Sequence, residues 1–101
     1  MRIIFCTCPK DSSEVIADAV LNERLVACVN IIEGVKSKYW WNNELNTDIE
    51  CLLIMKTRDE LIDSVIQKIK EVHPYQVPEI ISVEISEGNK DYIEWIKKET
   101  Q

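Results

Sequence analysis

The residues best suited to chemistry include two cysteines near the N-terminus. Cys6 and Cys8 stand two apart in an apolar segment, and side chains at that spacing on a strand point to the same face. Thiolates suit soft ions such as Cu(I), so the pair could share a metal ion. Buried cysteines also serve commonly as small apolar core residues, and packing is the expected role of Cys28 and Cys51.

The only histidine, His73, begins the segment HPYQVPEI at residues 73–80. Imidazole is a ligand for copper and zinc, although a single histidine needs further ligands from a cysteine or from a second subunit. A histidine at the end of a helix can instead bond the last free carbonyls, where the helix dipole favours positive charge. Pro74 is expected to end the helix there, so both interpretations fit the sequence.

Composition and motifs argue against several classes of protein. Acidic residues outnumber basic ones by 18 to 12, for a net charge of −6, whereas nucleic-acid binding needs clustered Lys and Arg. No apolar run approaches the roughly 20 residues that span a bilayer, and no signal-peptide pattern precedes the first strand. There is no nucleophile beside a histidine and no paired-carboxylate motif. We expect a cytoplasmic protein with reduced cysteines that binds neither nucleic acid nor membrane and is not an enzyme.

The elements that must position these residues follow from the apolar patterning. Asp11 with Glu14, and Thr57 with Glu60, have the spacing of a capping box, which predicts the starts of two helices. These helices end near residues 24 and 72, and a short apolar face predicts a third helix near the C-terminus. Short β-forming runs predict strands over residues 2–8, 25–32, 49–55 and 78–85.

The predicted order is βαββαβ followed by a helix. This is the arrangement of ferredoxin-like α+β domains, in which one antiparallel sheet carries two helices on one face. Neither internal repeats nor linker-like segments interrupt it. We therefore expect a single domain over residues 1–101.

The hairpin between the second and third strands is too long for a domain of this size. Its longer arm, residues 26–41, spans roughly 50 Å at about 3.3 Å per residue, whereas the expected radius of gyration is only about 13 Å. A bulge is expected at Glu33-Gly34 and a tight turn at Asn43, which tolerates positive φ. Exposed aromatic residues at 39–41 predict contact with another copy of the chain.

Five stretches carry a family resemblance, and in chain order they are LVACVN, SKYWWNNEL, MKTRDEL, HPYQVPEI and DYIEWI. Together they resemble the CutA divalent-cation-tolerance family over nearly the whole chain. The resemblance implies a ferredoxin-like homotrimer with hairpins that reach neighbouring subunits, as in PII signalling proteins. It also implies a link to tolerance of copper and other divalent metals, with no organic cofactor. Asn43 stands where the family usually has glycine, which should alter only the turn.

The resemblance also implies two sets of site residues. Cys6 and His73 correspond to family positions associated with metal binding. The family motifs further suggest a cluster of Tyr39, Lys56, Tyr75 and Glu79, where Lys56 and Glu79 are expected to meet near one cleft. Such a cluster is either a salt bridge and a tyrosine hydrogen bond at a subunit boundary, or a pocket for a small anion or metal ligand. The resulting hypotheses are a copper-binding protein and a PII-like protein that binds a small ligand or a partner protein.

Overall fold

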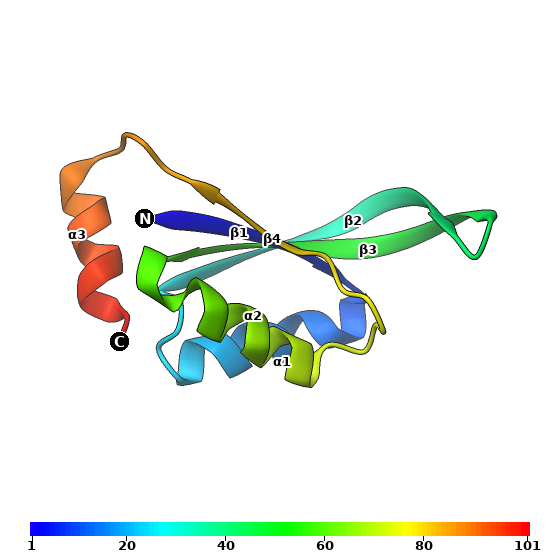
Figure 1. Cartoon of the computed structure of the whole chain (residues 1–101), viewed down its shortest axis with the longest axis horizontal. Coiled ribbons are helices and arrows are strands. Elements are labelled where there is room, and N and C mark those ends of the chain that lie inside the picture. The colour runs from blue at the N-terminus through cyan, green and yellow to red at the C-terminus, as the bar shows by residue number, and fades with distance from the viewer.

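One antiparallel sheet organises the chain. The computed structural model describes residues 1–101 and pairs four strands in the order β2-β3-β1-β4 (Figure 1). The α+β ferredoxin-like prediction is confirmed, although β2 and β4 begin later than expected. The strands are β1 (Arg2–Cys8), β2 (Cys28–Trp41), β3 (Glu44–Thr57) and β4 (Ile80–Glu84).

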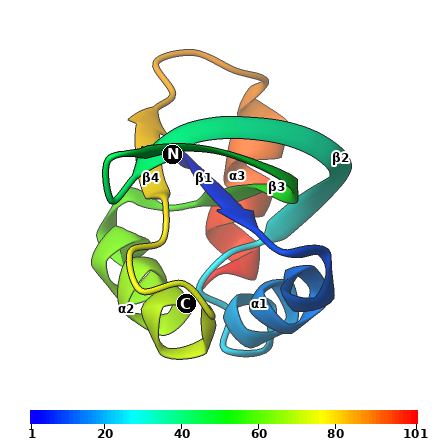
Figure 2. The ribbon, with the colours of Figure 1, turned by 90° about the vertical axis from the view of Figure 1, so that its right-hand side faces the viewer.

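Two helices, α1 (Lys10–Asn22) and α2 (Ile62–Val72), cover one face of this sheet side by side (Figures 1 and 2). The third helix, α3 (Lys90–Glu99), lies at the end of the sheet away from the hairpin tip. None of the helices is both long and apolar enough to cross a bilayer.

Strand alternation decides which side chains form the core. Successive strand residues point to opposite faces, so one set meets the helices and the other set points away from them. On the opposite face, Ile81 and Val83 stay 55% and 45% exposed, and Ile32 is 45% exposed. The core-facing set and its helical partners are Ile4, Cys6, Cys8, Cys51, Leu53 and Met55 with Ile16, Val20, Val65 and Ile69.

The long hairpin projects from the sheet as predicted, which gives the molecule a length of 45 Å against a width of 26 Å. Asn42 and Asn43 form its two-residue turn with φ angles of 50° and 64°, the positive values of a type I′ turn. The expected bulge lies between Ile32 and Val35, where Gly34 has a φ of 75°.

Neither predicted capping box forms. α1 begins at Lys10, directly after Pro9, so Asp11 already lies in its first turn and no side chain caps the helix. Thr57 is still part of β3, and its hydroxyl donates to the carbonyl of Leu25 at 2.6 Å. The chain then enters α2 through a 3-10 turn over Asp59–Leu61. The cap at Asp11 is absent because α1 starts earlier than predicted. The cap at Thr57 is absent because its hydroxyl bonds Leu25 instead.

Pro74 ends α2 as expected. The last helical residue is Val72, and His73 is extended with a ψ of 134°, because proline excludes the α conformation from the residue before it. The chain therefore leaves the helix as a loop over residues 73–79 that runs past the base of the hairpin to β4.

Candidate functional site

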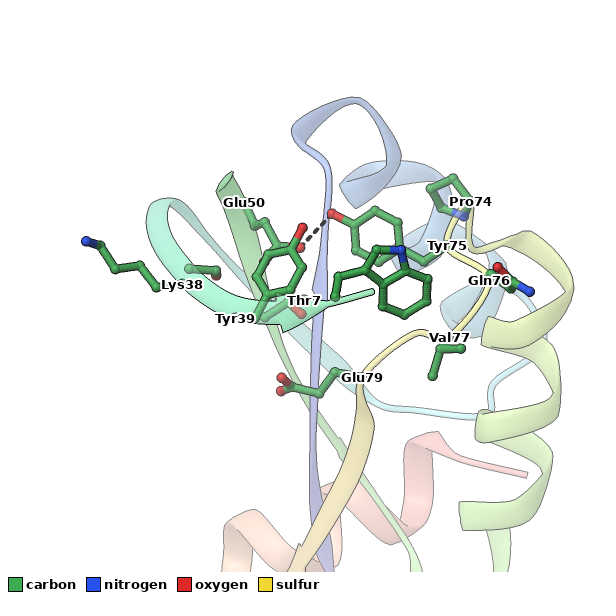
Figure 3. Close-up of a pocket in the computed structure, with 11 residues that line it drawn as sticks. Thr7, Lys38, Tyr39, Glu50, Pro74, Tyr75, Gln76, Val77 and Glu79 are labelled. Carbon is green, nitrogen blue, oxygen red and sulfur yellow. Dashed lines mark hydrogen bonds between the residues drawn. The ribbon is translucent and has the colours of Figure 1, made fainter. Parts of the chain in front are cut away.

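A pocket of about 660 Å³ lies between this loop and the hairpin (Figure 3). Alternate residues of β3 point to the same side, so Glu50 shares a side with Leu52, and Leu52 pairs with Thr7 of β1. The loop over residues 73–79 forms the other wall of the pocket, opposite the hairpin. The residues that carry its chemistry are Thr7, Tyr39, Trp41, Glu50, Tyr75 and Glu79.

Two tyrosine–carboxylate hydrogen bonds organise the pocket. The Tyr75 hydroxyl donates to Oε2 of Glu50 at 2.6 Å, and the Tyr39 hydroxyl donates to Asp48. Burial, and then the bond to Glu50, raise the pKa of Tyr75, and the bond to Asp48 is the main cause that raises the pKa of Tyr39. Both phenols therefore stay protonated and act as donors to these carboxyl groups.

Glu50 is the most important site residue that the sequence analysis missed, and Thr7 and Trp41 were also not predicted. The Glu50 side chain is buried, with the residue only 6% exposed, and it has no ion-pair partner. The one signal in the sequence is a charged residue at the start of the apolar run ECLLIM. Glu79 is also without an ion pair and is exposed at the entrance to β4. The amine of Lys38, the only basic residue of the pocket wall, points away from the other side chains.

His73 holds the loop in place with both ring nitrogens. Its Nδ1 accepts the backbone N–H of Tyr75 at 3.1 Å, so its Nε2 carries the proton and donates to the carbonyl of Thr7 at 2.8 Å. The ring is buried and packs at 4.8 Å from the ring of Tyr75. Of the two roles left open for His73, a bond from the ring to the last carbonyls of α2 is excluded, because both ring nitrogens bond other groups.

Cys6 lies in the core between the sheet and the helices and is fully buried. Burial raises the pKa of its thiol from 9.0 to about 12, and burial likewise raises the pKa of Cys8 to about 11. Metal binding requires a deprotonated thiol and a free imidazole nitrogen. No three His, Cys, Asp or Glu side chains of the chain are grouped to hold a metal ion, so a metal at Cys6 and His73 would need further ligands from another subunit.

Lys56 lies far from the pocket. It pairs with Ile3, at the other end of β1 from Thr7, and its amine bonds the side chain of Asn30 on β2. It lies six positions along β3 from Glu50, which is roughly 20 Å of strand. The predicted meeting of Lys56 and Glu79 is therefore wrong, while Tyr39, Tyr75 and Glu79 come together as expected.

An antiparallel sheet with two helices on one face, a projecting hairpin and a pocket at its base define a PII-like α+β protein. Solved structures agree with this class: a PII-like CutA protein from Nostoc aligns with 100% of this chain and 98% of its own, at a TM-score of 0.94 and 35% identity. The family model described as CutA1 divalent ion tolerance protein matches residues 2–99. The chain belongs to this CutA1 family.

Individual relatives give the same result. The divalent-cation tolerance protein CutA of Thermus thermophilus is 39% identical over 98% of this chain and 97% of its own length. The chloroplastic protein CutA 1 of rice is 42% identical over 98% of this chain, which spans only 56% of that relative. A crystal structure of CutA1 from Pyrococcus horikoshii superimposes with a TM-score of 0.96 at 39% identity, over 100% of this chain and 99% of its own.

Proposed function

We propose that this chain acts in divalent-cation tolerance as a non-catalytic, PII-like binding protein, with residues 1–101 as one domain. The observation that carries the proposal is the pocket of about 660 Å³ beside the hairpin, because small-molecule sites typically measure about 300–1,000 Å³ and combine apolar walls with a few polar groups. Tyr39, Tyr75 and Glu79 are the ligand-binding residues expected from the family motifs, and Glu50 joins them.

Calorimetry of the purified protein against a panel of metabolites and divalent ions tests this function. Binding by the wild type should weaken in a Tyr75→Ala variant, which removes one wall of the pocket. The matched control is Tyr92→Ala on α3, outside the pocket, and it should bind as the wild type does. If the wild type binds no compound or ion of the panel, the ligand-binding function is refuted.

The proposed assembly is a homotrimer. It is supported by apolar side chains that a single chain leaves exposed, both on the hairpin, where Trp40 is 72% and Leu45 63% exposed, and on the open sheet face at Ile81. Exposed apolar surface of this kind marks contact with a partner. Light scattering should give a trimer mass that falls in Ile81→Lys but not in the matched surface control Val15→Lys on α1. An unchanged mass in both would exclude the open face as the interface.

The proposed location is the cytoplasm. Its support is the set of four unpaired cysteines, since disulfides persist mainly in oxidising compartments. Fractionation of the source cells with an antibody to the protein tests it, and recovery from an organelle, as the name of the rice relative describes, would contradict it.

The second candidate function is copper binding by Cys6 and His73. The description of the family as divalent ion tolerance proteins favours it. Binding would require the Cys6 thiol to lose its proton inside the core and the His73 ring to give up its bond to Thr7 or to Tyr75. Copper titration should then lose a site in Cys6→Ser and in His73→Gln, with Cys28→Ser as control. Equal stoichiometry in all four proteins would exclude this site.

A further inference from the structure

The pocket beside the hairpin has a specific charge character. We infer that its ligand is a small organic cation, an ammonium group on a compact apolar body. This inference rests on the proposed ligand-binding function and adds the chemical class of the ligand. The argument depends on three features of the pocket wall, which are its unpaired carboxylates, its aromatic side chains and its lack of a directed positive charge.

The carboxylates leave the pocket with uncompensated negative charge. Neither Glu50 nor Glu79 forms an ion pair, and the amine of Lys38 points away from them. The nearest hydrogen-bond donors are already in use, because the Tyr75 hydroxyl donates to Glu50 and His73 Nε2 donates to the carbonyl of Thr7. Within one chain, an anionic ligand would meet two like charges without a cation to offset them, which is strongly unfavourable.

Glu50 in particular has no opposite charge beside it and only one side-chain hydrogen bond. It is only 6% exposed, and its one hydrogen bond within the pocket uses Oε2. A carboxylate has about four acceptor positions on its two oxygens, and a buried charge is costly unless it is paired and hydrogen-bonded. A primary ammonium would supply the opposite charge and N–H donors for the acceptor positions that Tyr75 leaves free.

The aromatic side chains account for the rest of the ligand. The rings of Tyr39, Tyr75 and Trp41 line the pocket together with Glu50 (Figure 3). Such rings attract a cation through their faces and bury an apolar body. A hard divalent ion instead needs about six oxygen ligands, and no three metal-binding side chains converge here. The wall therefore favours an organic cation over a metal ion.

Three ligands that share a phenylethyl group test this inference by calorimetry on the assembled protein. The probes are 2-phenylethylamine, which is cationic, 2-phenylethanol, which is neutral, and 3-phenylpropionate, which is anionic. The amine should bind at least about tenfold more tightly than the alcohol, the effect of a hydrogen-bonded charge pair, and the acid should not bind.

Variants assign the preference to the carboxylates. Glu50→Gln should reduce amine affinity to that for the alcohol, and Glu79→Gln, at an exposed position, should reduce it in part even if Glu50→Gln fails to fold. Glu87→Gln, an exposed acid in the loop before α3, is the matched control and should bind as the wild type does.

The outcomes separate this inference from the proposed function. If the alcohol or the acid binds as tightly as the amine, or if Glu50→Gln and Glu79→Gln both keep the full preference, the cation inference is overturned while the pocket remains a ligand site. Mn²⁺ binding that depends on Glu50 and Glu79, without amine binding, overturns it in favour of a metal. If neither the three probes nor any metabolite or ion of the wider panel binds, both this inference and the proposed ligand-binding function are refuted.

Discussion

The buried thiols of Cys6 and Cys8 should make this protein lose stability at alkaline pH. Burial raises the pKa of Cys6 from 9.0 to about 12 and that of Cys8 to about 11. Above pH 9, thiols in the unfolded chain release protons that the folded chain retains. The unfolded state then binds fewer protons, so the free energy of unfolding falls as pH rises. This stabilising contribution is complete below pH 9 and is lost as pH rises toward the folded pKa.

The size of the effect follows from the pKa shifts. Each pH unit between the unfolded and folded pKa removes about 1.4 kcal/mol per thiol. Raising the pH from 8 to 10 should therefore lower the free energy of unfolding by about 1.3 kcal/mol for each of the two thiols, or about 2.6 kcal/mol together. That is a large part of the stability of a typical domain, about 5–15 kcal/mol.

Urea denaturation at pH 8 and pH 10, at one fixed protomer concentration, measures the loss. Cys6→Ala should lose only about half of the thiol contribution, because one titrating group is gone. The tyrosines titrate equally in both proteins and cancel in the comparison. Ile4→Val, at a core position on the same face of β1, should be less stable at both pH values with the wild-type pH dependence. If Cys6→Ala loses as much stability as the wild type, the reasoning is refuted.

Three local interactions are tested by substitution and urea denaturation. Tyr75→Phe removes the 2.6 Å bond to buried Glu50 and should cost about 2 kcal/mol; a neutral effect would mean that water or another group satisfies the carboxylate. Asn43 has a φ of 64°, so Asn43→Val should cost about 1–2 kcal/mol and Asn43→Gly should not; equal effects would exclude backbone strain. Asn89 accepts the N–H of Asp91 at 3.0 Å, so Asn89→Ala should cost about 1 kcal/mol, clearly more than Asp11→Ala, which removes no cap.

Much of the fold could be predicted because its signals are local. The turn at Asn43, the bulge at Gly34 and the end of α2 at Pro74 depend on the φ and ψ angles that each residue allows. The order of strands and helices follows from periodic apolar side chains. These features require no knowledge of which segments meet in space.

The two capping boxes could not be judged in the same way. Spacing alone permits Asp11 and Thr57 to cap helices, but a side chain bonds whichever partner the folded chain brings close. The hydroxyl of Thr57 meets the carbonyl of Leu25 because β3 and the segment before β2 lie together. Pro9 is at the cap position of α1, and Asp11 lies two residues further on, inside the first turn.

The sequence by itself determined the family, the α+β architecture and the group of Tyr39, Tyr75 and Glu79. The tertiary structure decided which residues line the pocket. Buried Glu50 lies in it, whereas Lys56 lies at the other end of the sheet. Both ring nitrogens of His73 form hydrogen bonds within the chain. Strand register sets these placements. Since register depends on long-range pairing, a difference of six residues along β3 separates a pocket residue from one about 20 Å away.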